Sequence, residues 1–303
     1  MRKIVNVIMV VFLLLALNNN AEAQRWKKNR SYLTVHLGAT GFLGDLGGGK
    51  DIGSIGPKDF DFQTTRPLLG VGYSYLLSER FNLKTNAYLG WIGGDDQWTP
   101  QYHRNARNLH FRSILGELSA QAEYYVTVQN IGKNWGRRKA KKMPVTTYVF
   151  AGIGGIYFNP KAQYTDGTWH ALQPLNTEGQ GLVETRKPYS RFSVAFPFGV
   201  GAKYEINRRY SLGFEYGLRY TLTDYMDDVS STYFDREKIR QEYGDIAAYF
   251  SNPADLTDSE VAYITKAGEQ RGNPNGNDAY MFAQFSLYIN LYKSTANICS
   301  FQY

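Results

Sequence analysis

The sequence predicts an all-β protein, a transmembrane antiparallel up-and-down β-barrel, most simply one of eight strands. The clearest observation is the segment 210–222, where apolar residues alternate strictly with Ser, Gly, Glu, Arg and Thr. A tilted membrane-spanning strand needs about 9–11 residues, whereas ordinary strands average about 5–6, so this length favours a membrane barrel. The chain also contains 24 Tyr, 17 Phe and 5 Trp. Membrane barrels place such residues in girdles at both interfaces.

The N-terminus has the pattern of a secretory signal peptide. Arg2 and Lys3 precede an apolar run over residues 4–17, and Ala21-Glu22-Ala23 offers small residues at the cleavage positions. We therefore expect a signal peptide over residues 1–23 and one mature domain over residues 24–303. No other segment approaches the roughly 20 apolar residues of a spanning helix, so membrane residence implies a barrel. The single cysteine, Cys299, has no partner for an internal disulfide.

The net charge gives no indication of a nucleic-acid partner. Cleavage would remove Arg2, Lys3 and Glu22 and leave 32 basic against 26 acidic residues, a net charge near +6. That excess is too small for a nucleic-acid signature.

Seven further segments show apolar residues at alternate positions and supply the other strands of the barrel. Their apolar faces fall within residues 33–37, 69–77, 81–91, 114–126, 145–157, 192–206 and 281–291. Together with 210–222 they give an even number of strands, as bacterial barrels require.

The connections alternate between short and long. Ser78-Glu79 and Asn207-Arg208 are tight turns, whereas residues 41–65, 93–109, 158–188 and 224–277 form long loops. Outer-membrane barrels have long extracellular loops and short periplasmic turns, so we expect the outer membrane of a Gram-negative bacterium with both termini in the periplasm. Residues 129–144 are the exception, a long and basic link on the periplasmic side.

Two of the long loops contain structure of their own. Asp166-Gly167 indicates a hairpin turn, which either extends the third loop as a ribbon or makes a ten-stranded barrel; we favour eight strands. In the fourth loop, helical spacing over residues 235–250 and a capping box at 257–260 predict two short helices. These helices form either a lid over the barrel mouth or a packed cap.

The strand faces opposite the apolar ones carry charged residues that would point into the lumen. Eight strands leave no room for a free channel, so we expect a structural network of paired charges rather than a conducting pore. The predicted network comprises Lys84, Glu117, Glu123, Arg191, Lys203, Glu205, Glu215 and Arg219.

Several longer phrases are more specific than barrel patterning. They are GDLGG at 44–48, RNLHFRSILGELS at 107–119, FNPKA at 158–162, LQPLNTEGQG at 172–181 and TDYMDDVSSTY at 223–233. Their order and spacing resemble the PorG family, outer-membrane components of the type IX secretion and gliding machinery of Bacteroidetes-type bacteria. The resemblance runs from the first strand to about Asp235, and the helical insertion that follows is larger than the family pattern.

The resemblance implies a non-enzymatic outer-membrane protein that associates with the periplasmic ring of the PorK lipoprotein and PorN. An adhesin-like barrel that binds surface ligands through its long loops is the alternative. The sequence contains no nucleophile motif such as G-x-S-x-G, so we expect no enzyme and no cofactor.

A cluster of carboxylates at the base of the fourth loop could hold calcium, since Ca²⁺ prefers hard oxygen ligands. It consists of Asp224, Asp227 and Asp228, without EF-hand spacing. Hydrogen bonding within the loop base is the interpretation that we favour.

The strongest basic clusters all fall on the predicted periplasmic side, whereas residues 224–277 carry a net charge of −6. These clusters could simply meet anionic lipid headgroups. The sharper hypothesis is that the link 129–144 docks on an acidic face of the periplasmic ring. The predicted docking residues are Lys133, Arg137, Arg138, Lys141 and Lys142.

Overall fold

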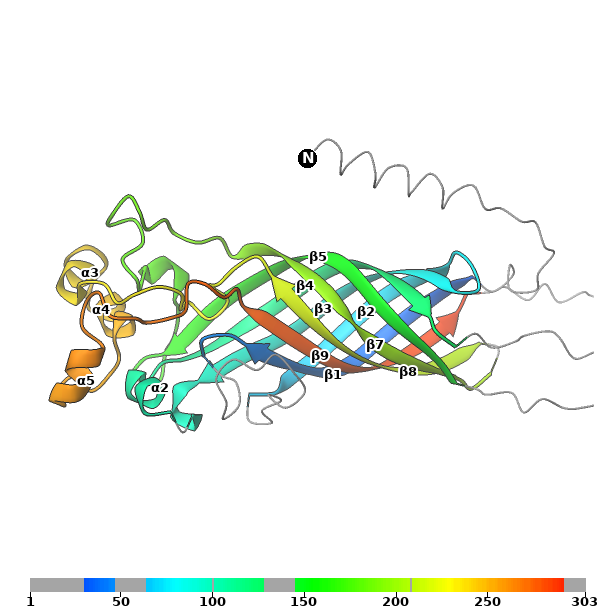
Figure 1. Ribbon diagram of the computed structural model, residues 1–303, viewed down its shortest axis with the longest axis horizontal. Helices are drawn as coiled ribbons and strands as arrows, with labels where there is room; N and C mark the ends of the chain where they lie inside the picture. Colours follow the sequence, from blue (N-terminus) through cyan, green and yellow to red (C-terminus); the bar gives the residue numbers. More distant parts are fainter. Residues whose placement is uncertain (1–29, 47–63, 100, 128–144, 208, 292–303) are drawn as a thin grey trace, which may run out of the picture.

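The computed structural model describes residues 30–46, 64–99, 101–127, 145–207 and 209–291. Within these residues, eight long antiparallel strands form a closed barrel, which confirms the predicted fold class. The barrel strands are β1 (Ser31–Leu43), β2 (Arg66–Leu76), β3 (Phe81–Asp95), β4 (His110–Tyr125), β5 (Val145–Gln163), β7 (Phe192–Glu205), β8 (Tyr210–Thr221) and β9 (Ala279–Asn290). Each strand pairs with its neighbours in sequence order, and β1 pairs with β9 to close the ring (Figure 1).

The additional strand β6 (Trp169–Ala171) pairs only with the end of β5 and extends it as a short ribbon. The turn at Gly167, whose φ is +86°, allows this hairpin. Of the two alternatives for the third loop, the structure therefore has the ribbon and not ten barrel strands.

The predicted tight turns are also present. Asn207 Oδ1 accepts hydrogen bonds from the backbone N–H groups of Arg209 and Tyr210. Ser78 Oγ accepts from Arg80 and Phe81 in the same manner. Both turns lie at one end of the barrel, opposite the end that carries the helices (Figure 1).

The outer surface of the barrel is apolar and the inner surface polar. In β8, Leu212 and Phe214 are 48% and 43% exposed, while Ser211 before them, Gly213 between them and Glu215 after them are buried. Water would solvate such an outer face poorly, so the barrel has the lipid-facing surface of a membrane barrel. Met281 departs from this pattern: it lies on the outward face but is buried, because the Tyr216 hydroxyl lies 3.5 Å from its sulfur and covers it.

Several strands continue past the predicted ends of their apolar faces. β5 runs to Gln163 although its apolar alternation ends at Tyr157, because β4 supplies cross-strand pairing as far as Lys161. β3 likewise continues to Asp95. Hydrogen-bonded pairing needs no apolar side chain, so hydrophobic alternation underestimates the strands where they leave the membrane.

The helices lie at one end of the barrel (Figure 1). The second long connection contains η3 (Asp96–Trp98) and α2 (Tyr102–Arg107), which the sequence analysis did not predict, and the third contains η4 (Gln173–Leu175). The fourth contains α3 (Arg236–Tyr243), α4 (Asp245–Ser251) and α5 (Ser259–Ile264). Among the described residues, no helix is long and apolar enough to cross a membrane.

The prediction of two helices in the fourth connection was wrong in two details, the number of helices and the N-cap of the last one. Gly244, with φ of +89°, divides the first into α3 and α4. The N-cap of α5 is Asp258 rather than Thr257, because the Asp258 carboxylate accepts from the N–H groups of Glu260 and Val261. Thr257 instead donates its hydroxyl to Asp255.

Candidate functional site

Ion pairs cross the lumen at two levels. Lys84 on β3 contacts Glu215 on β8, which is four strands away around the eight-stranded ring in either direction. The Lys84 ammonium also lies 2.7 Å from the Glu123 carboxylate on β4. The first level therefore spans the full diameter of the barrel.

The second level contains Arg219 and Glu117. Arg219 Nε lies 3.5 Å from Glu117 Oε2, and the Tyr280 hydroxyl on the opposite side of the barrel donates to the same oxygen at 2.8 Å. The Arg219 guanidinium also lies 4.0 Å from the centre of the Phe282 ring. Side chains that meet across the whole ring leave no continuous passage through it.

The predicted luminal residues are distributed unevenly. Lys84, Glu117, Glu123, Glu215 and Arg219 are all buried inside the barrel. Lys203 lies toward the end of the barrel opposite the helices, which we call the uncapped end. Its ammonium there is 4.0 Å from the centre of the Tyr32 ring. Glu205 is half-buried next to that end, and Arg191 lies at the bend before β7, half-buried and outside both levels of ion pairs.

We use the term cap for the described residues of the four long connections, namely 44–46, 64–65, 96–99, 101–109, 164–190 and 222–278. Each of the four connections, together with the strand ends next to it, contributes apolar side chains to one buried cluster. This cluster is continuous with the hydrophobic residues inside the barrel at the end that carries the helices. Leu46, Leu109, Leu172, Val229 and Phe250 are examples. The cap is therefore a folded layer over the barrel mouth rather than a set of separate loops.

A buried Arg271 lies at the centre of the cap. Its Nη1 donates to Glu178 Oε1 at 3.0 Å and to the backbone carbonyl of Asp228 at 2.7 Å. Glu178 also accepts from the backbone N–H groups of Ser230 and Ser231. One ion pair thus joins the third connection to two points of the fourth.

A second charged group joins the first and second connections. Asp96, which is fully buried, accepts from Nε and Nη2 of Arg107, both at 3.0 Å. Arg107 also donates to the backbone carbonyls of Asp45 at 3.1 Å and Arg271 at 2.5 Å. The two charged groups therefore meet at the backbone of Arg271, and all four connections are linked.

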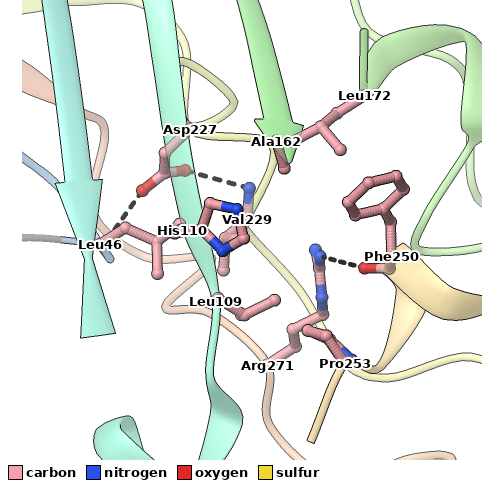
Figure 2. A pocket seen from close by; sticks show the side chains of 10 residues that line it. All are labelled: Leu46, Leu109, His110, Ala162, Leu172, Asp227, Val229, Phe250, Pro253 and Arg271. Carbon is pink, nitrogen blue, oxygen red and sulfur yellow. Dashed lines mark hydrogen bonds between the residues drawn. The ribbon is translucent and has the colours of Figure 1, made fainter. Parts of the chain in front are cut away.

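The three aspartates of the calcium candidate turn to different partners. Asp227 accepts from the N–H groups of Leu46 and Val229, at 2.9 and 3.0 Å (Figure 2). Asp228 accepts from the hydroxyls of Thr177 and Tyr189, and Asp224 is half-buried beside them. In the described part of the chain, no three His, Cys, Asp or Glu side chains are grouped to hold a metal ion. Asp227 and Asp228 therefore accept hydrogen bonds within the cap, as in the interpretation that we favoured from the sequence.

A small pocket lies inside the cap and is shown in Figure 2. Its free space is about 10 Å³, roughly the room for one water molecule. The lining residues are Leu46, Leu109, His110, Ala162, Leu172, Asp227, Val229, Phe250, Pro253 and Arg271. A space of this size cannot admit an organic substrate.

Arg271, Glu178, Arg107 and Asp96 were not among the site residues predicted from the sequence. Glu178 and Arg107 lie within the phrases at 172–181 and 107–119, so those phrases contained a signal for them. Arg271 follows the larger insertion and lies outside every phrase, and its role depends on contacts with residues 43 and 93 positions away. The docking residues Lys133, Arg137, Arg138, Lys141 and Lys142 lie outside the described residues, as do the signal peptide and Cys299.

We expect the cap to be more stable at pH 5 than at pH 8. Burial raises the pKa of Asp228 to about 6 and that of Asp224 to about 7, above the value of about 3.9 in an unfolded chain. Because the folded cap binds protons that the unfolded cap releases, this stabilisation is complete below about pH 4 and is lost as the pH rises to about 7. For the fully buried Asp228, two pKa units correspond to about 3 kcal/mol.

Urea titration of the cap at pH 5 and pH 8 would measure this difference. Asp224→Asn removes one of the groups responsible and should reduce the pH dependence between about pH 4 and pH 7. A cap that is equally stable at both pH values, or more stable at pH 8, would contradict the assignment.

The comparisons with known proteins give a family. The model of a family described as "Domain of unknown function (DUF6089)" matches residues 5–249. No match was found among curated proteins.

Several solved structures are similar at low identity. Neisserial surface protein A has 9% sequence identity and a TM-score of 0.39, with 86% of this chain and 96% of that chain covered. Ail, the attachment invasion locus protein of Yersinia pestis, solved with the heparin analogue sucrose octasulfate, has 8% identity and a TM-score of 0.36, with 86% and 98% covered. The outer membrane protein OprG from Pseudomonas aeruginosa has 9% identity and a TM-score of 0.32, with 87% and 94% covered.

Proposed function

The chain belongs to the DUF6089 family, and we propose that it is a non-enzymatic outer-membrane component of the type IX secretion and gliding machinery. In this proposal it associates with the periplasmic ring of PorK and PorN. The resemblance of five sequence phrases to the PorG family suggests the machinery. The cap then faces the cell exterior, and both termini lie in the periplasm.

The observation that carries the proposal is the blocked lumen. Lys84 and Glu215 meet across the barrel, and a second layer of contacts joins Glu117 with Arg219 and Tyr280. The pocket within the cap has room for about one water molecule. A barrel whose lumen is crossed by paired side chains at two levels is suited to act through its surfaces.

The surface at the uncapped end carries the proposed partner contact. β4 ends at Tyr125 and β5 begins at Val145, and these two strand ends, which the basic link 129–144 connects in sequence, lie at the end of the barrel opposite the cap (Figure 1). This link contains Lys133, Arg137, Arg138, Lys141 and Lys142. Opposite charges steer association and make it sensitive to salt, so an acidic face of the ring is the expected partner.

We expect that reversing Arg137, Arg138, Lys141 and Lys142 to Glu leaves barrel insertion intact but weakens recovery of the ring and reduces secretion. Co-purification from mildly solubilised membranes at two salt concentrations would measure the effect. A matched control reverses Lys238, Arg240 and Lys266 on the cap, whose side chains are exposed. Unchanged ring recovery by the link variant would exclude the link as the docking site.

A surface-ligand-binding barrel is the second candidate, and exposed apolar side chains on the cap favour it. Tyr263 on α5 is 66% exposed, and Ile246 and Leu256 are also exposed. An adhesin-like function predicts that substitutions of these cap residues abolish the protein's function in cells, whereas charge reversal of the link leaves that function intact. The secretion proposal predicts the opposite pattern in the same two variants.

A further inference from the structure

Two cations face each other on the outer wall of the barrel near the cap. Arg112 on β4 pairs directly with Lys161 on β5, and both side chains belong to the outward face. Like charges in directly opposed positions of a sheet destabilise it. Neither side chain forms an ion pair with any residue that the structure describes, although other cations of this end, such as Arg107, have carboxylate partners.

The Arg112 guanidinium is held in place by an aromatic ring. It lies 3.4 Å from the centre of the Trp169 ring. Trp169 is fixed in turn by pairing with Gln163 in the β5–β6 ribbon and by an edge contact with His110, at 6.3 Å between ring centres. Stacking occupies the face of a guanidinium and leaves its N–H edge available. That edge can donate two parallel hydrogen bonds to one oxyanion.

The nearest carboxylate on the strands paired with β4 and β5 does not neutralise Arg112 and Lys161. Asp95 lies opposite His110, one outward position beyond Arg112. Its carboxylate accepts the N–H of Gln97 and caps η3. Asp166, at the tip of the ribbon, accepts the N–H and hydroxyl of Thr168.

The two cations lie just beyond the aromatic edge of the lipid-facing surface. Along β4 and β5, the next outward residues toward the membrane centre are Ile114 and Asn159, followed by Tyr157. Tyr157 contacts Phe192 on β7, with 5.0 Å between ring centres, and Trp91 pairs with Ile114 on the other side. Aromatic residues mark the membrane interface, so Arg112 and Lys161 lie at the level of lipid headgroups.

We propose that Arg112, Lys161 and Trp169 form a binding site for the phosphate group of a lipid in the leaflet next to the cap. A lipid phosphate supplies the negative charge that the opposed cations lack, and its acyl chains can lie against the apolar wall below. If the cap faces outside, the leaflet is the outer one and the ligand is a phosphorylated glycolipid. The proposal goes beyond the secretion role and requires only that the barrel spans a membrane.

The test uses the full mature chain in maltoside micelles, which contain no phosphate, supplied with a small fraction of either diphosphoryl lipid A or the same lipid after removal of its phosphates. Native mass spectrometry would measure the lipid A retained by the protein. We expect selective retention of the phosphorylated form. Each cation near a membrane surface contributes about 1 kcal/mol, so Arg112→Gln or Lys161→Gln should weaken retention about fivefold and the double variant about thirtyfold.

Lys238→Gln with Lys266→Gln, which removes two exposed charges from the cap, is the matched control and should leave retention unchanged. Equal retention of both lipid forms by the wild-type protein would overturn the proposal without any variant. Wild-type retention by the doubly neutralised protein would also overturn it. Millimolar inorganic phosphate should compete only weakly with lipid A, and complete displacement would identify a site for free phosphate instead.

Discussion

Replacing Lys84 by methionine should destabilise the barrel by about 3–5 kcal/mol, because the change leaves two buried carboxylates without their shared cation. Methionine fills much of the same volume, so the loss arises from charge rather than from a cavity. Glu215 keeps the hydrogen bonds from Tyr148 at 2.6 Å and Gln284 at 2.7 Å, but these neutral donors do not balance its charge. The midpoint of urea unfolding in lipid vesicles would measure the effect.

The triple variant Lys84→Met, Glu123→Gln and Glu215→Gln provides the control. Replacement of a whole buried ionic group by neutral residues is often neutral or stabilising, so the triple variant should recover most of the lost stability. Lys238→Met on the exposed surface of α3 should change stability by less than about 0.5 kcal/mol. A Lys84→Met protein as stable as the wild type would mean that Lys84 does not balance these carboxylates.

The positions that form this luminal network were largely predictable from the sequence. Side chains of a strand alternate between its two faces, so Lys84 and Glu215 had to lie opposite their apolar neighbours. Their pairing with each other was not predictable, because they lie 131 positions apart and meet only when the ring closes with three strands between them on either side. Alternation determines the face of each residue but not its height along the barrel.

Arg191 and Lys203 illustrate this limit. Both have the inward parity of β7, yet Arg191 lies before the strand begins and Lys203 lies near the uncapped end. Neither reaches the two levels where charges cross the lumen. The height of a residue depends on strand tilt and on the register between strands, which a single chain does not reveal.

The cap was predicted less completely than the barrel. Helical spacing and a capping pattern located α3, α4 and α5, since these signals are local. The sequence left open whether these helices form a movable lid or a packed layer. The burial of Val229 and Phe250 in one core with Leu46 favours the packed layer, and this outcome depends on residues about 200 positions apart.

The phrases that resemble the PorG family acquire a physical explanation in the cap. Asp45, Arg107, Glu178 and Asp228 come from four different phrases, and each contacts a charged residue or the backbone of another connection. Short motifs of this kind encode contacts between distant loops. They are therefore visible in the sequence before the contacts themselves can be inferred.

Replacing Arg271 by leucine should release the cap from the barrel while the barrel itself stays folded. Glu178 and Asp228 would remain buried without their cation, and breaking a buried ion pair in this way costs about 3–5 kcal/mol. Arg107 would keep its contact with the backbone carbonyl of residue 271 and with Asp96, so the second connection should be affected less. The loss should therefore be concentrated in residues 224–278.

Limited proteolysis of the folded protein in vesicles measures this opening directly. Cleavage of a transiently opened segment follows its equilibrium population, so a loss of 3 kcal/mol should accelerate cleavage within residues 224–278 about a hundredfold. Heat-modifiable electrophoretic mobility would show that the barrel remains intact. Arg240→Leu is the matched control, because Arg240 forms exposed ion pairs with Glu237 and Asp245 that contribute less than about 1 kcal/mol, a change of no more than about fivefold. If both variants were cleaved at the same rate, Arg271 would not be the residue that holds the cap together, and the apolar core around Phe250 would have to do so alone.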